Sequence, residues 1–140
     1  MVNQAAWNQK HMGWTKIEPV GTPDNALRLT GADIIERLEA ALAACDPAQS
    51  VAWTQAYLES GADRSALVER LALMASRFGN DPHNQEIPQC LLQDYGNNQC
   101  ADRERLLLAC AHICAGHRKY GDAFEAARRF GEAMGIAELQ

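Results

Sequence analysis

The sequence has few of the features that mark nucleic-acid-binding, membrane or secreted proteins. Its 13 Lys and Arg residues are outnumbered by 18 Asp and Glu residues, which gives a net charge of −5. Nucleic-acid-binding proteins usually carry a basic face. No apolar run approaches the about 18 residues of a membrane span, and the N-terminal stretch MVNQAAWNQKHMGW has no apolar secretory segment. We therefore expect a cytoplasmic protein with no nucleic-acid and no membrane partner.

The motifs of several enzyme classes are also missing. The sequence contains no CxxC pair, no glycine-rich phosphate loop, no GxSxG elbow and no paired acidic motif. A thioredoxin-like, nucleotide-dependent or serine-hydrolase enzyme is therefore not expected. The five cysteines are odd in number, and Cys110 and Cys114 stand one helical turn apart. This pattern favours reduced and mostly buried thiols.

Helical periodicity is what the sequence does contain, from residue 30 onward. With 140 residues, 47% of them hydrophobic, the chain is long enough for one domain with a real core. Helices are predicted at about 31–45, 47–60, 63–78, 82–95, 101–119 and 122–135. Short loops make consecutive helices antiparallel neighbours. The predicted class is all-α, with about six antiparallel helices in three hairpins that form a single domain over 31–140.

The helix ends carry capping signals, and the helix interiors carry apolar stripes. The predicted caps are Thr30 with Asp33, Asp46 with Pro47, and Asp122 with Glu125 as a capping-box partner. The stripes of the first and third helices are Ile34, Ile35, Leu38, Leu42 and Cys45, and Leu67, Leu71, Met74 and Phe78. Pro88 conflicts with the fourth helix because it removes a backbone donor. Either that helix kinks near Gln85, or 82–86 is a separate turn.

Residues 1–30 are predicted to form an extended, irregular N-terminal arm. They are rich in Gly and Pro and show little helical periodicity. Trp7, Met12 and Trp14 argue against full disorder, because such side chains usually pack on a surface. That surface is this domain, a second copy in a homo-oligomer, or a protein partner.

A faint internal repeat runs through the helical region. The stretches ERLEAALAA, ERLALMASR and ERLLLACAH begin at residues 36, 69 and 104, a spacing typical of helical-hairpin repeats. Within 106–136, Gly121-Asp122 stands where a tetratricopeptide unit has its turn glycine, and Ala126, Phe130 and Ala133 match its second helix. This segment resembles a tetratricopeptide hairpin. Cys110, Cys114 and His117 depart from the motif of its first helix, and the rest of the chain does not match it.

One polar cluster stands out as a candidate site. The stretch GNDPHNQEIPQC, residues 79–90, places His83 and Glu86 on the fourth helix, and the fifth helix carries His117. If these two helices pair in an antiparallel way, their side chains aim at one place, as in metal sites of helical bundles. The catalytic or metal-binding residues would be His83, Glu86 and His117. The surrounding pocket residues would be Asn84, Cys110, Cys114 and Tyr120.

Three chemistries remain open for this site, and one non-enzymatic alternative competes with all of them. His83, Glu86 and His117 could hold a divalent metal ion with water, or a His and Glu86 could act as a metal-free acid–base pair. A thiol site would use Cys110 or Cys114 activated by His117. We expect a small-molecule or metal site with oxidoreductase or acid–base chemistry. The alternative is a helical-hairpin accessory module that binds a protein partner.

Overall fold

The computed structural model describes residues 21–78, 82–116 and 121–136, with the side chains of 82–84 left out. Within these residues the protein contains one short 3-10 helix, six α-helices and no strand, which confirms the predicted all-α class. In chain order the elements are η1 (Ala26–Arg28), α2 (Gly31–Ala43), α3 (Pro47–Glu59), α4 (Arg64–Phe78), α5 (Pro82–Asn97), α6 (Arg105–Cys114) and α7 (Ala123–Met134).

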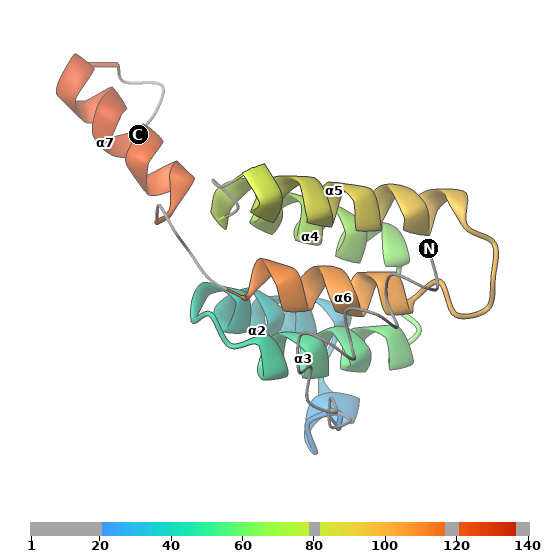
Figure 1. Ribbon diagram of the computed structural model, residues 1–140. Coiled ribbons are helices and arrows are strands. Elements are labelled where there is room, and N and C mark those ends of the chain that lie inside the picture. Colours follow the sequence, from blue (N-terminus) through green and yellow to red (C-terminus); the bar gives the residue numbers. More distant parts are fainter. Residues whose placement is uncertain (1–20, 79–81, 117–120, 137–140) are drawn as a thin grey trace, which may run out of the picture.

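Five of the helices pack into a bundle, and the sixth projects from one end of it (Figure 1). Helix α2 packs along α3, and α4 packs along α5, an arrangement that is compatible with the first two predicted hairpins. Helix α6 joins these pairs, because it packs against α3, α4 and α5. Helix α7 contacts α4 and leads away from the bundle (Figure 1). A hairpin of α6 with α7 stays a prediction.

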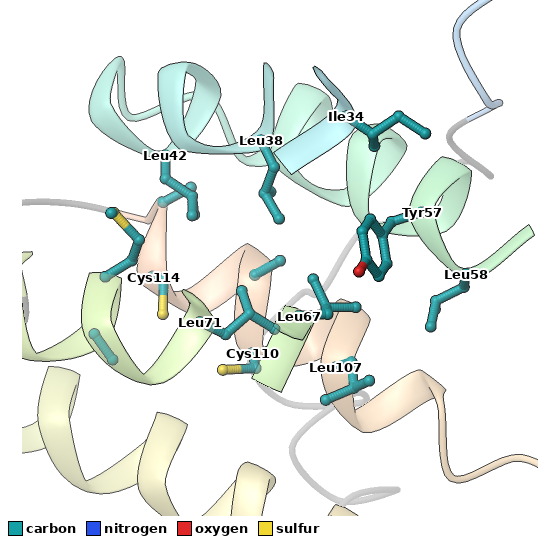
Figure 2. Packing of buried hydrophobic residues seen from close by; sticks show 14 of the residues in the cluster. Ile34, Leu38, Leu42, Tyr57, Leu58, Leu67, Leu71, Leu107, Cys110 and Cys114 are labelled. Carbon is teal, nitrogen blue, oxygen red and sulfur yellow. The ribbon is translucent and has the colours of Figure 1, made fainter. Parts of the chain in front are cut away.

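The core lies where α2, α3, α4 and α6 meet, and Leu is the most frequent residue in it (Figure 2). Its fully buried members include Ile34, Leu38, Leu42, Leu67, Leu71 and Leu107. The predicted stripe of α4 is confirmed in full, since all four of its apolar residues are buried. Burial of each large side chain contributes about 1.5–3 kcal/mol, so this cluster is the main source of stability.

The predicted caps are confirmed at three helix starts. The side chains of Thr30, Asp46 and Asp122 accept backbone N–H groups at the starts of α2, α3 and α7. Thr30 and Asp33 form a complete capping box. The capping-box role predicted for Glu125 is wrong, because its carboxylate pairs with Arg128 and Arg129 instead.

The stripe of the first helix ends earlier than predicted. Cys45 is exposed, and its φ of 54° lies in the left-handed region. Its N–H donates to the Leu42 carbonyl at 3.2 Å, and the Asp46 N–H donates to the Ala41 carbonyl at 3.0 Å. These two hydrogen bonds form a Schellman motif, which turns the chain out of the helix before Cys45 can reach the core.

Two other predicted boundaries differ from the structure. Helix α5 runs through the fully buried Pro88, so the alternative in which 82–86 forms a separate turn is wrong. Helix α6 begins at Arg105 rather than near 101, because hydrogen bonds three residues apart, such as that from Arg103 N–H to the Cys100 carbonyl, keep 100–104 in turns.

The predicted N-terminal arm is described only in its last ten residues. There η1 packs against α3 and buries Ala26, so this part of the arm carries a turn of helix. Residues 1–20, and with them Trp7 and Trp14, lie outside the described residues.

Candidate functional site

The two cysteines of α6 lie in the core. Cys110 is fully buried and Cys114 is 7% exposed, and both are packed among the Leu side chains of α2 and α4 (Figure 2). A hydrogen bond with Cys114, together with burial, raises the pKa of the Cys110 thiol far above its usual range. A thiol in this state is a poor nucleophile, because the reactive form is the thiolate. The geometry therefore does not favour a thiol site, and Cys110 acts as a small core residue.

Glu86 and the buried Cys110 do not line a common solvent-accessible pocket. It is exposed, whereas α5 turns the buried Pro88 and Tyr95 toward the bundle. Glu86 precedes Pro88 by two residues, which places it about 200° away around the helix. Since Cys110 has no exposed surface, an open pocket that contains both side chains is not formed.

The histidines and two polar residues of the predicted site are placed only in part or not at all. His83 and Asn84 belong to α5, but their side chains lie outside the described residues, and so do His117 and Tyr120. Among the side chains that the structure describes, no group of three or more His, Cys, Asp or Glu residues is arranged to hold a metal ion. The His83–Glu86–His117 site stays a prediction.

A groove of about 570 Å³ lies between α5 and α4. Its lining residues are Val68, Ala72, Ala75 and Ser76 from α4, and Gln85, Gln89, Leu92 and Gln93 from α5. Both helices contribute residues with the same spacing, i, i+4, i+7 and i+8, which is one face of each helix. The α4 side is formed by small side chains, so another element could approach closely.

The sequence contains a signal for this groove that differs from the predicted His/Glu site. Gln85, Gln89 and Gln93 recur at every fourth position of α5 and form a neutral polar edge. The stretch 79–90 therefore contributes to a groove wall through Gln85 and Gln89. That wall of α5 faces α4, whereas the predicted site was placed between α5 and α6.

Among the described residues, Arg77 links the end of α4 to the start of α7. Arg77 binds the Asp122 carboxylate through Nε at 2.8 Å and through a terminal nitrogen at 2.7 Å. Its guanidinium also lies over the Phe124 ring, 5.6 Å from the centroid. The hydrogen bond from Arg77 lowers the pKa of the Asp122 carboxyl, which the N-terminal amides of α7 lower further.

The other feature of α7 is an exposed apolar face. Ala123, Ala127, Phe130 and Met134 follow at i, i+4, i+7 and i+11 and so lie on one side of the helix. Phe130 is 59% exposed and Met134 is 62% exposed. The charged residues of α7 occupy the opposite side, where Arg128 pairs with Glu125 and Glu132. Large exposed apolar side chains gathered on one face mark an interaction surface.

No family model, curated protein or solved structure matches this chain. None of the helices in the described part of the chain is long and apolar enough to cross a membrane.

Proposed function

We propose that this protein is a non-enzymatic interaction module whose α4–α5 groove binds an amphipathic α-helix. The observation that carries the proposal is the groove itself, which is open, mainly apolar and framed by two helices with matching residue spacing. Recognition of a helix in such a groove uses apolar anchors at i, i+3, i+4 and i+7 of the bound helix.

The chemistry of the groove supports a protein ligand over a reactive small molecule. Its polar groups are the amides of Gln85, Gln89 and Gln93 and the hydroxyl of Ser76. These groups do not titrate near neutral pH, so they can orient a ligand by hydrogen bonds but cannot act as general acid or base. Small residues opposite them leave room for the side chains of a bound helix.

The charged residues around the groove indicate which charges a bound helix should carry. Glu69 of α4 and Glu86 of α5 are exposed and neighbour the groove residues on their solvent side. A helix with an apolar face flanked by Arg or Lys would therefore bind better than one flanked by Asp or Glu.

The experiment is an NMR titration of the ¹⁵N-labelled full chain with a synthetic amphipathic peptide. The peptide would have about 18 residues, with Leu at helical spacing and Lys on the other positions. We expect amide shift changes that cluster on α4 and α5 and are lost in Ala72→Arg, which fills the groove. The matched control is Ala109→Arg, which places the same side chain at an exposed position of α6. Shift changes that lie elsewhere, or their absence at millimolar peptide, would overturn the proposal.

A further inference from the structure

We infer that the helix bound in the α4–α5 groove is α7 of a second copy of this chain, so that the protein forms a reciprocal dimer. The inference rests on the proposed function, because it names the partner that the groove receives. Two complementary surfaces occur in one chain: an apolar groove without charged lining residues, and an amphipathic helix with an exposed apolar face.

The geometry of attachment directs α7 away from the groove of its own copy. The groove is lined by α4 residues 68–76, whereas α7 is fixed at Arg77, directly after the groove ends. From this anchor α7 extends beyond the end of the α4–α5 pair (Figure 1). To cover its own groove, α7 would have to turn back and lose the contacts of Arg77 with Asp122 and Phe124.

The apolar face and the groove also match in size. The residues that line the groove on α4 span about 12 Å, and the stripe from Ala123 to Met134 on α7 spans about 16 Å, at 1.5 Å per residue. Phe130 and Met134 are one turn apart, so both can enter one groove. Ala123 and Ala127 precede them and allow the backbone of α7 to approach α4.

On α7, arginines lie closer to the apolar face than carboxylates do, and the rim of the groove carries carboxylates. Around α7 the charged residues nearest the apolar face on its two sides are Arg128 and Arg129, and Glu125 and Glu132 lie behind them. Around the groove the flanking exposed charges are Glu69 and Glu86. Docking of α7 would therefore bring Arg128 and Arg129, which also pair with Glu125 of their own helix, toward the exposed Glu69 and Glu86.

The area available is close to the minimum for a specific dimer. The two large side chains of the α7 stripe, Phe130 and Met134, are 59% and 62% exposed, which amounts to about 240 Å² of apolar surface at about 200 Å² for each side chain. A two-fold symmetric dimer contains this contact twice, and each contact buries the groove as well as the helix. If the groove loses as much surface as the helix, the total is about 1,000 Å², which is the lower limit for a specific protein–protein interface.

The test is the association state of the full chain in solution, measured by sedimentation equilibrium and native mass spectrometry. We expect a wild-type dimer whose dissociation constant rises about 30-fold in Phe130→Asp, the size of a hot-spot loss. Ala72→Arg should have a similar effect from the groove side. Leu27→Asp is the matched control, because Leu27 is 90% exposed on η1, far from both surfaces in the sequence, and should leave the dimer intact.

Mixing the two variants distinguishes a reciprocal dimer from other assemblies. A heterodimer of Phe130→Asp with Ala72→Arg keeps one intact helix–groove contact, so the mixture should associate more strongly than either variant alone. A wild type that stays monomeric to about 1 mM, a dimer that Phe130→Asp leaves intact, or a mixture that does not associate would each overturn the inference.

The failure of this inference is separable from failure of the proposed function. If the wild type is monomeric but the groove still binds the amphipathic peptide, only the identity of the helix is wrong. If the groove binds neither α7 nor the peptide, both the helix-binding function and the α7-mediated dimer are wrong. The peptide titration is therefore repeated on Phe130→Asp, in which the groove is expected to be vacant.

Discussion

The five cysteines occupy two chemical environments that differ in solvent access. Cys45, Cys90 and Cys100 are exposed, whereas Cys110 and Cys114 are buried between helices. The prediction of mostly buried thiols is confirmed for Cys110 and Cys114 and is wrong for Cys45, Cys90 and Cys100. Cys45 in particular was expected to belong to the apolar stripe of the first helix. The difference arises from the backbone, since a left-handed residue at the end of α2 redirects the Cys45 side chain to solvent.

We predict that a thiol reagent labels these cysteines in two separate phases. With iodoacetamide at pH 8, Cys45, Cys90 and Cys100 should react rapidly, because reaction needs an accessible thiolate. Cys110 and Cys114 should react only when the fold opens, because they are buried and the pKa of Cys110 is raised. Mass spectrometry of labelled peptides over time measures this directly. Equal rates at all five sites would contradict the packing of α6.

The predicted metal site at His83, Glu86 and His117 has its own test at the scale of single residues. If it exists, protein purified without a His-tag should contain about one equivalent of a divalent metal, as elemental mass spectrometry would detect. The metal should be lost in both His83→Ala and His117→Ala. Metal that is absent from the wild type, or that both variants retain, would exclude this site and leave the interaction module as the working function.

At the scale of elements, α4 joins the other helices through three arginines. Arg64 pairs with Glu104 at 2.9 Å, Arg70 pairs with Glu39 of α2 at 2.8 Å, and Arg77 pairs with Asp122 at 2.7 Å. The first two link elements that also share a buried core. Arg77 is different, because the helix that it holds buries little else.

We predict that Arg77→Ala releases α7 while the bundle stays folded. The variant loses an exposed ion pair of up to about 1 kcal/mol and a cation–π contact of about 0.5–1 kcal/mol. Amide hydrogen exchange should therefore accelerate in α7 and remain unchanged in α2 to α6. Arg70→Ala is the matched control, because it removes an ion pair of similar exposure and length from the same helix. Acceleration of α7 in both variants would refute the specific role of Arg77.

The attachment and helicity of α7 should also depend on pH. Hydrogen bonds from Arg77 lower the pKa of the Asp122 carboxyl, and those from Arg128 and Arg129 lower the pKa of Glu125 to about 2. Because these pKa values lie below the unfolded ones, the stabilisation is complete above about pH 4.5 and is lost as the pH falls toward 2.

We therefore expect the NMR signals of α7 to approach coil values between about pH 4 and pH 2. In Asp122→Asn the ion pair with Arg77 is lost at every pH, so the remaining pH-dependent change should depend on Glu125 alone. Helix signals of α7 that are unchanged down to pH 2 would show that these carboxylates do not hold it.

At the scale of the whole molecule, stability is concentrated in the core and not in α7. Leu107 is fully buried where α6 packs against α3, α4 and α5. We predict that Leu107→Ala lowers the free energy of unfolding by about 2–5 kcal/mol, through lost burial and a cavity. Urea unfolding monitored by circular dichroism measures the change. Leu27→Ala, at a 90% exposed position, should change it by less than about 0.5 kcal/mol, and equal effects would contradict the assigned core.

The sequence by itself determined the elements of this protein. Helix starts depend on local chemistry, and Thr30, Asp46 and Asp122 cap their helices as the sequence predicts. The stripe of α4 follows from helical periodicity alone, because residues three or four positions apart share a face whatever the rest of the chain does.

Only the tertiary structure decided which faces meet. Loop lengths did not predict that Gln85, Gln89 and Gln93 of α5 would line a groove with α4. They also did not predict that Glu86 would be exposed to solvent. The sequence of α7 does not show whether the bundle would bury its apolar side. Arg77 settles this, since it fixes α7 at the end of α4 and leaves Phe130 and Met134 exposed. Such contacts join residues distant in sequence, and their energies depend on how several helices pack at once, which no local pattern encodes.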